Sequence, residues 1–209
     1  MCCNGFCTTW ANYIISSNSY GNCIDIIKTI EDNSIDCIIT EPPYNTEING
    51  FSNVIKFEEL WVQFNRILKP NRNIIIICAQ PFSSKLIISN LKQYRYSYYW
   101  KHNRIEYHTQ TRPHYIFEEI CVFGGEKINK TDNLTSFIDI DYDQVYTDYY
   151  KKPIKLYKYL INLYTDAGDM VLDCFAGSEN LALACQETNR DFILIESNFE
   201  KYNNIVSYV

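Results

Sequence analysis

The chain has 209 residues and a formal net charge of −6, with 46% hydrophobic and 15% aromatic residues. This composition excludes a disordered protein and suits one globular domain with a large core. No apolar run reaches the roughly 18 residues that cross a bilayer, and the N-terminus lacks the basic start and long apolar segment of a signal peptide, so we expect a cytoplasmic protein without a membrane segment.

The chain contains nine cysteines, and no two of them form a Cys-x-x-Cys pair. A zinc site would need a second ligand pair at suitable spacing, so we expect no metal and reduced thiols. Six cysteines lie in or beside apolar segments, where a free thiol behaves as a small hydrophobe. Cys2, Cys3 and Cys7 cluster at the N-terminus, and no role is predicted for them.

The first part of the chain alternates between strand and helix patterns. Residues 13–17 predict a weak strand, and residues 23–30 carry apolar side chains at helical spacing. The apolar run at 36–40 predicts a short buried strand. Residues 57–68 predict an amphipathic helix that ends before a Lys-Pro-Asn turn, and the apolar run at 73–79 is typical of a central parallel strand.

The middle of the chain is less regular. After a Gln-Pro-Phe turn, Ser83 or Ser84 is the expected cap of a helix that continues to Leu91. Residues 94–101 and 116–123 alternate enough to predict two strands. Residues 124–150 are acidic and lack clear periodicity, which predicts a mobile loop or a reduced specificity element.

The last part returns to regular alternation. We expect a helix after Pro153, a strand at 170–175, a helix at 178–188, a strand at 191–196 and a final helix at 200–209. Strands that alternate with helices predict an α/β fold, a three-layer sandwich around a mostly parallel sheet. No linker interrupts the pattern, so residues 1–209 are expected to form a single domain.

Basic and aromatic side chains are interleaved between Lys85 and His114. This stretch holds six lysines and arginines and all three histidines, and Glu106 is the only acid in it. Basic and stacking groups together suit unpaired bases or a phosphate track. The alternative is a strand with solvated polar residues on one face and aromatic residues on the other.

The segment Thr-Glu-Pro-Pro-Tyr-Asn at 40–45 directly follows the strand predicted at 36–40. Pro42 and Pro43 cannot continue that strand or donate hydrogen bonds, and their fixed φ leaves their carbonyl groups aimed into the cleft. Glu41 accepts hydrogen bonds beside them, and Tyr44 offers a stacking face. An acid, a carbonyl group and an aromatic ring at one strand end can together bind a flat ring that bears an amino group.

A second pattern is Asp-Met-Val-Leu-Asp-Cys-Phe-Ala-Gly at 169–177. The predicted strand ends in Asp173, and a turn of small residues then leads into a helix, as in nucleotide-binding sites at the carboxyl edge of a sheet. Gly177 lets the backbone approach a ligand closely. Glu196 ends the next strand, where a carboxylate commonly accepts hydrogen bonds from ribose hydroxyls. The alternative is an ordinary strand–turn–helix with a capping acid.

Taken in order along the chain, these pieces resemble the amino DNA methyltransferases, which methylate adenine N6 or cytosine N4. The catalytic tetrapeptide precedes the cofactor strand, as in the permuted β class and its phage-type members. The resemblance runs through IDIIKTIEDNSIDCIITEPPYN, FEELWVQFNRILKPNRNIIIICAQPFSSKLI, EEICVF and KPIKLYKYLINLYTDAGDMVLDCFAGS. It implies a Rossmann-like S-adenosylmethionine-dependent methyltransferase fold, and methyl transfer to the N6 amine of adenine in DNA.

The resemblance also implies roles for individual residues. Glu41 and the Pro42 carbonyl group would accept the two protons of the amine, within the tetrapeptide completed by Pro43 and Tyr44. Tyr44 would stack on a base that has left the duplex. Asp173 would lie near the methionine end of the cofactor. The other residues expected to bind the cofactor are Phe175, Gly177, Ser178, Glu196, Lys152, Pro153 and Asn22.

Several positions depart from the family pattern. Glu41 replaces an aspartate, and its extra methylene group shifts the carboxylate by roughly 1 Å. Glu179 replaces a glycine of the cofactor turn and brings a negative charge toward the methionine carboxylate. Phe117-Glu118 occupies the place of a His-Glu pair in the family. Residues Asp148 to Pro153 occupy the place of a His-Pro-Thr-Gln-Lys-Pro type stretch.

These departures leave alternatives open. One is a catalytically impaired relative that binds DNA, cofactor or a protein partner without turnover. Another is methylation of cytosine or RNA, because the tetrapeptide suits any planar ring with an amino group. The expected partner is DNA with a flipped base. Family members pair as dimers, so a homodimer is a further expectation, and residues 124–150 would be the reduced target-recognition element.

Overall fold

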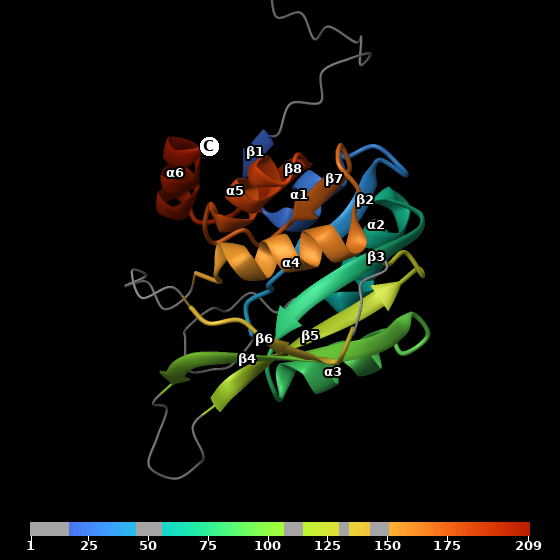
Figure 1. The fold of residues 1–209 in the computed structure, drawn as a ribbon. Coiled ribbons are helices and arrows are strands. Elements are labelled where there is room, and N and C mark those ends of the chain that lie inside the picture. The colour runs from blue at the N-terminus through green and yellow to red at the C-terminus, as the bar shows by residue number, and fades with distance from the viewer. Residues whose placement is uncertain (1–16, 45–55, 107–114, 130–133, 143–150) are drawn as a thin grey trace, which may run out of the picture.

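The computed structural model of the chain describes residues 17–44, 56–106, 115–129, 134–142 and 151–209. These residues form one eight-stranded sheet with helices on both faces (Figure 1). The strands are β1 (Ser17–Tyr20), β2 (Ile35–Thr40), β3 (Leu68–Cys78), β4 (Tyr94–Glu106), β5 (Tyr115–Gly124), β6 (Phe137–Asp139), β7 (Met170–Asp173) and β8 (Asp191–Glu196). The helices are α1 (Cys23–Ile27), α2 (Phe57–Ile67), α3 (Phe82–Ser89), α4 (Ile154–Tyr164), α5 (Asn180–Glu187) and α6 (Phe199–Tyr208).

The sheet has the strand order β1-β8-β7-β2-β3-β5-β4-β6. The pairs from β1 through β8, β7 and β2 to β3 are all parallel, as is β4 with β6, whereas β5 runs antiparallel to both β3 and β4. Ile38 of β2 lies in register with Ile74 on one side and Leu172 on the other. The mostly parallel sheet expected from the sequence is therefore confirmed.

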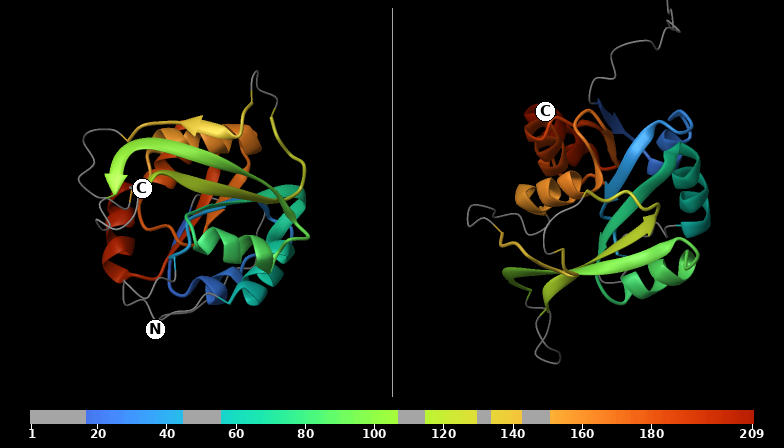
Figure 2. Two further views of the ribbon diagram at one scale, coloured as in Figure 1. Left: turned by 90° about the horizontal axis from the view of Figure 1, so that it is seen from below. Right: turned by 45° about the vertical axis from the view of Figure 1, so that its right-hand side comes forward.

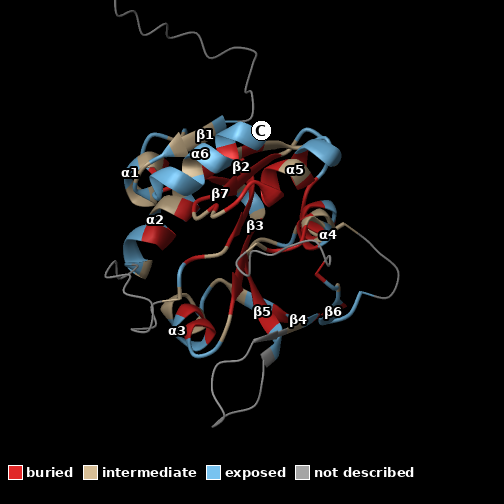
Figure 3. Cartoon of the chain, turned by 90° about the vertical axis from the view of Figure 1, so that its left-hand side faces the viewer, coloured by how far each residue is buried: buried red, intermediate tan, exposed pale blue. Residues whose placement is uncertain are grey.

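Two apolar cores lie on opposite faces of the sheet. Helices cover both faces and make the fold a three-layer sandwich (Figure 2), and the strands between them are largely buried (Figure 3). Ile39, Ile75 and Ile77 face α4 and α5, whereas Ile38 and Ile74 face α1 and α2. Successive side chains of a strand point to opposite faces, and both faces are covered here. This explains why β2 and the second half of β3 are continuous apolar runs.

The third strand begins earlier than expected. It follows α2 without a turn and starts at Leu68, which pairs with Ile35. Pro70 therefore lies inside the strand, in the irregular stretch before Cys37 pairs with Asn73, where the missing N–H of a proline is tolerated. The helix ends where the sequence predicted, but the expected turn is an irregular stretch within the strand: residues 69–72 have no register partner on β2, and Asn71 has a left-handed φ of +60°.

The serine cap predicted for α3 was wrong. The helix begins at Phe82, before either serine, with Pro81 as its capping residue after the cis peptide bond between Gln80 and Pro81. Ser83 is fully buried inside the first turn, and the Ser84 hydroxyl donates to the side chain of Gln80 at 2.8 Å. Both serines are therefore helical residues and not caps.

Other boundaries differ by a few residues. The first described strand is β1, residues 17–20, while residues 13–16 of the expected strand lie outside the described residues. Helix α1 ends at Ile27. Residues 137–139, in the segment expected to be irregular, form the edge strand β6, and Ile138 is buried against the core. Residues 130–133 and 143–150 of that segment lie outside the described residues.

Candidate active site

The two sequence patterns meet at the carboxyl edge of the sheet. Because β2 and β7 are parallel neighbours, the residue before the tetrapeptide lies beside the acid that ends β7. Thr40 Oγ1 donates a hydrogen bond of 2.6 Å to Asp173 Oδ1, across 133 residues of sequence. The segments at 40–44 and 173–177 are therefore adjacent in the fold.

Asp173 is almost fully buried at this edge, with 1% of its surface exposed. Burial raises the pKa of its carboxyl group to about 7, although the hydrogen bonds from Thr40 and from the Phe175 backbone N–H oppose the rise. A carboxyl group with this pKa changes its charge near neutral pH.

The turn after β7 is tied to the end of β8. Gly177 adopts a left-handed φ of +62°, and its backbone N–H donates to Glu196 Oε2 at 2.8 Å. Glu196 Oε1 accepts from the backbone N–H of Asn198 at 2.6 Å. Each carboxylate oxygen has a second acceptor site, so Glu196 remains able to accept from a ligand hydroxyl.

The remaining residues expected to bind the cofactor lie around this turn. Asn22 caps α1 through Ile24, and the neighbouring Gly21 N–H donates to the Glu196 carbonyl group. Ser178 is buried, and Phe175 packs against the core that faces α1 and α2. Pro153 begins α4 as its capping residue.

The tetrapeptide is held by contacts of Tyr44 with Glu41, with a second acid and with an aromatic ring. The Tyr44 hydroxyl lies 3.0 Å from Glu41 Oε1 and 3.2 Å from Glu118 Oε2, so its one proton reaches one carboxylate at a time. Its ring packs on Phe82 with centroids 5.5 Å apart and an angle of 39° between the planes. Pro42 is buried and Pro43 is exposed. A stacking role of Tyr44 toward a base remains a prediction.

The side chain of Lys152 lies at the tetrapeptide, although it was expected at the cofactor. Its ammonium nitrogen is 2.8 Å from Glu41 Oε1 and 3.1 Å from Glu118 Oε2. Burial alone would lower the pKa of Lys152, but the Glu118 and Glu41 carboxylates outweigh this and hold it well above its ordinary value. The main chain of Lys152 stays near the cofactor turn, because its carbonyl group accepts from Asn180 Nδ2 at 2.7 Å.

Glu118 belongs to the altered His-Glu pair of the sequence analysis, where it was assigned no role in the site. It lies on β5 and is buried, with 7% of its surface exposed. His102 Nε2 on β4 is 3.8 Å from Glu118 Oε1. The available signals were the altered His-Glu pair and the presence of two acids, Glu118 and Glu119, in a mostly apolar strand pattern, where a buried acid requires a partner.

Glu179 is also buried, at the start of α5. Both of its carboxylate oxygens accept from the ammonium group of Lys151, at 2.8 and 3.0 Å. The negative charge that was expected to repel the methionine end of a cofactor is therefore compensated by a neighbouring cation.

Residues 94–106 of the basic and aromatic stretch form β4, whose three Lys and Arg side chains all have partners, whereas residues 107–114 lie outside the described residues. Arg95 bonds to Glu126 and Lys101 to Asp139, while the Arg104 guanidinium lies 3.8 Å from the centre of the Tyr142 ring. Trp100 is fully buried. β4 therefore has the two faces of the alternative interpretation, and contact of the whole stretch with bases or phosphates stays a prediction.

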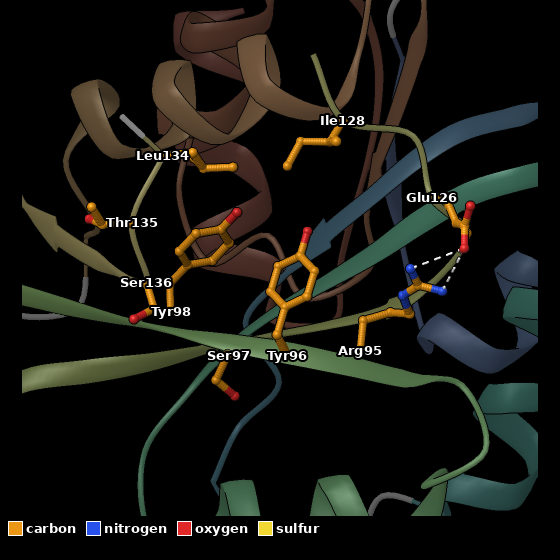
Figure 4. A pocket seen from close by; sticks show the side chains of 10 residues that line it. Arg95, Tyr96, Ser97, Tyr98, Glu126, Ile128, Leu134, Thr135 and Ser136 are labelled. Carbon is orange, nitrogen blue, oxygen red and sulfur yellow. Dashed lines mark hydrogen bonds and ion pairs between the residues drawn. The ribbon is translucent and has the colours of Figure 1, made fainter. Parts of the chain in front are cut away.

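A pocket of about 330 Å³ lies on this strand, apart from the tetrapeptide (Figure 4). Tyr96 and Tyr98 point from β4 toward Ile128 and Leu134, which lie on the opposite wall. The hydroxyl of Tyr164 lies within hydrogen-bonding distance of both tyrosine hydroxyls, at 3.2 Å from Tyr96 and 2.9 Å from Tyr98. These hydroxyls therefore satisfy one another at the edge of the pocket.

Among the described helices, none has the length and apolar character needed to cross a membrane. The described ranges contain no cluster of three His, Cys, Asp or Glu side chains suited to a metal ion. The cysteines in those ranges are Cys23, Cys37, Cys78, Cys121, Cys174 and Cys185, and all are free thiols.

Comparison with known proteins gives consistent matches. The family model described as DNA methylase, of the N6/N4 type, matches residues 35–207. The type II methyltransferase M.HpaI of Haemophilus parainfluenzae is 29% identical over 217 aligned residues, which cover 86% of this chain and 69% of that protein.

Two solved structures have a similar fold. The M1.HpyAVI–SAM complex has a TM-score of 0.74 at 22% identity and covers 92% of this chain and 98% of its own. The PvuII DNA methyltransferase, described as cytosine-N4-specific, has a TM-score of 0.75 at 15% identity and covers 93% and 89%.

Proposed function

This chain belongs to the N6/N4 DNA methylase family, and on that basis we propose that it transfers a methyl group from S-adenosylmethionine to the N6 amine of adenine in DNA. The observation that carries the proposal is the hydrogen bond between Thr40 and Asp173. It sets the tetrapeptide that would bind the amine directly beside the turn that would bind the methyl donor.

The chemistry assigned to the tetrapeptide is activation of a poor nucleophile. The lone pair of an exocyclic amine is delocalised into the ring, and acceptors for its two protons localise that pair on nitrogen. Glu41 Oε1 is already bound by Tyr44 and Lys152, which leaves Oε2 as the oxygen for the amine. The Pro42 carbonyl group is the second acceptor, and fixed acceptors of this kind stabilise positive charge that develops on nitrogen.

The residues at the cofactor turn fit S-adenosylmethionine. A Cβ atom on Gly177 would have only the Phe175 carbonyl oxygen, at 3.8 Å, as a close described neighbour, so there is open space above this turn. Glu196 offers its free acceptor sites to ribose hydroxyls, and Lys151 compensates Glu179. When bound, the cofactor supplies a methyl group on a positively charged sulfur atom.

Adenine is proposed over cytosine because tyrosine occupies the fourth place of the tetrapeptide, as in the adenine-methylating relatives that the sequence resembles. The fold alone does not separate the two bases, since PvuII methyltransferase, a similar fold, is described as cytosine-N4-specific. The identity of the methylated base is therefore the main result that the experiment must deliver.

The test is to incubate the purified protein with tritiated S-adenosylmethionine and duplex DNA of mixed sequence, and to separate the nucleosides after digestion. We expect the label in N6-methyladenine and its loss in Glu41→Gln. Label in N4-methylcytosine would assign cytosine instead, and label in a parallel RNA sample would assign RNA.

Calorimetry with S-adenosylmethionine identifies the remaining outcome, a protein that binds the cofactor but transfers no methyl group. Cofactor binding without any transfer to nucleic acid would reject the proposed reaction and identify a non-catalytic relative. In that case Glu41→Asp, which restores the family's residue, is the variant to assay for recovered transfer.

A further inference from the structure

Lys152 joins two acids that approach the same place from different elements. We propose that Lys152, anchored by Glu118, is a positioning residue that fixes the Glu41 carboxylate for the amine of the target base. This inference rests on the proposed function and assigns the side chain of Lys152 to the tetrapeptide in place of the cofactor.

The contacts form a closed ring of four groups. The Lys152 ammonium and the Tyr44 hydroxyl each approach the same two oxygens, Glu41 Oε1 and Glu118 Oε2, at distances from 2.8 to 3.2 Å. Two donors between two acceptors restrain both carboxylates at once. Lys152 and Glu118 are buried, with 6% and 7% of their surfaces exposed, so water competes little for these contacts.

Such restraint matters because glutamate has one more rotatable bond than aspartate. Lys152 binds Oε1, and Tyr44 adds a second bond when its proton points to Glu41; both contacts restrain the Glu41 rotamer and leave Oε2 for the substrate amine. An error of about 1 Å in the position of a reacting group can cost roughly a hundredfold in rate. Lys152 therefore offers a physical means by which a longer acid can serve in this tetrapeptide.

The electrostatics point to the same role. One ammonium lies between two carboxylates, and like charges at such short range otherwise oppose the ionisation of the second acid. The pKa of Lys152 is held well above its ordinary value, so the ammonium persists through the pH range of an assay. The other charged and titratable groups of described residues near this ring are Cys78, His102, Arg104, Tyr142, Tyr157 and Asp173.

The experiment compares Lys152→Met, Glu118→Gln and the double variant with the wild type. For Lys152→Met we expect kcat to fall by about a hundredfold, with KM for DNA and cofactor affinity changed by less than about twofold. The acid limb of the pH–rate profile should move up by about one pH unit or more, because two carboxyl groups then share the site without a cation.

The double variant separates charge balance from simple packing. With Glu118→Gln added, Glu41 faces no second negative charge, so the acid limb should return toward the wild-type position while kcat stays reduced. A purely structural lysine would lower the unfolding midpoint without moving that limb. Lys158→Met on α4 is the matched control, because Lys158 makes an exposed ion pair with Glu187, and it should leave kcat and the profile unchanged.

Two results would overturn the inference. One is a large loss of cofactor affinity in Lys152→Met, which would show that the Lys152 side chain binds the cofactor. The other is unchanged or higher kcat, which would show that the ammonium does not assist Glu41.

A readout without catalysis keeps the inference separate from the proposed function. In protein carrying ¹³C-labelled glutamate, the Glu41 carboxyl signal is identified by its absence in Glu41→Gln, and its titration midpoint should rise in Lys152→Met. If the wild type transfers no methyl group but this midpoint moves, the proposed reaction fails and the positioning contact stands. If the midpoint does not move, the positioning role fails by itself.

Discussion

Asp173 shows how one residue couples the site to the stability of the fold. Its carboxyl group is 1% exposed and accepts from Thr40 and from the backbone of Phe175 through the same oxygen. The neutral form is favoured up to a pKa of about 7, against an ordinary value of 3.8. Between these values the folded protein binds a proton that the unfolded chain has lost.

The free energy of unfolding should therefore fall as pH rises from about 4 to about 7. Relative to high pH, the protonated Asp173 stabilises the fold fully below a pH of 3.8, and this contribution is lost as the pH rises past about 7. At roughly 1.4 kcal/mol for each pKa unit, it amounts to about 4 kcal/mol. Asp173→Asn keeps the Oδ1 acceptor and carries no charge, so it should be more stable than the wild type at pH 8. Urea unfolding at pH 5 and pH 8 measures the difference.

Asp166→Asn is the matched control for this prediction. Asp166 is exposed, and its hydrogen bond from Lys127 lowers its pKa, so its contribution has the opposite sign and is lost as pH falls. An identical pH dependence of unfolding in the wild type and in Asp173→Asn would contradict the assignment to Asp173.

The pair Lys151–Glu179 supports a second prediction. The Glu179 side chain is 8% exposed and that of Lys151 is 24% exposed. Lys151→Met leaves a buried carboxylate unpaired, and allowing for the exposure of the lysine we expect a loss of about 2–3 kcal/mol. Glu179→Gln should cost less than about 1 kcal/mol, because the freed ammonium reaches water.

A double-mutant cycle in urea provides the measurement. Lys151→Met combined with Glu179→Gln should be close in stability to Glu179→Gln alone, since the two residues are coupled. Additive losses would show that the contact does not stabilise the fold and that Glu179 is tolerated for another reason.

At the scale of the secondary-structure elements, the backbone at the start of β3 packs directly against the backbone at the end of β5. Gly125 follows β5 and lies against the Asn71 backbone, where an added Cβ atom would be 2.2 Å from the carbonyl carbon. The backbone N–H of Gly125 donates to the Arg72 carbonyl group, and its own carbonyl group accepts from Asn73. These contacts leave no room for a side chain.

Gly125→Ala should therefore destabilise the protein by about 3 kcal/mol or more, because backbone must move to relieve the overlap. Gly168→Ala is the control: it has a φ of +85° and no atom within 4 Å of the added Cβ, so only backbone strain of about 1–2 kcal/mol is expected. Equal shifts of the two urea midpoints would contradict the close approach at Gly125.

On the scale of the whole molecule, one sheet contributes side chains to two apolar cores, one on each face. Cys37 and Cys185 belong to the core that faces α4 and α5, and Cys78, Cys121 and Cys174 belong to the core that faces α1 to α3. A single sheet between them predicts that both cores unfold together.

Thiol labelling tests this cooperativity. In protein with Cys2, Cys3 and Cys7 replaced by serine, the five buried thiols should react with a disulfide reagent at one common rate, set by global unfolding. The half-buried Cys23, with a pKa that burial raises to about 11, should react faster through local opening. Separate rates for the two groups of buried thiols would show that the faces of the sheet open independently.

The sequence by itself determined the layered fold and the place of the site. Apolar runs identified β2, the second half of β3, and β8, because strands buried on both faces need continuous apolar sequence. The order of the tetrapeptide and the cofactor strand then predicted their meeting, because carboxyl ends of parallel strands lie at one edge. These conclusions depend on neighbours in sequence or on general rules of sheet geometry.

Only the tertiary structure decided which groups compensate one another. No local pattern indicates that Lys152 lies between Glu41 and Glu118, or that Lys151 binds both oxygens of Glu179. The burial that shifts the pKa of Asp173 is likewise a property of the packed fold. Charge pairing and desolvation act through space, and a one-dimensional pattern carries no distances between segments that are far apart in the chain.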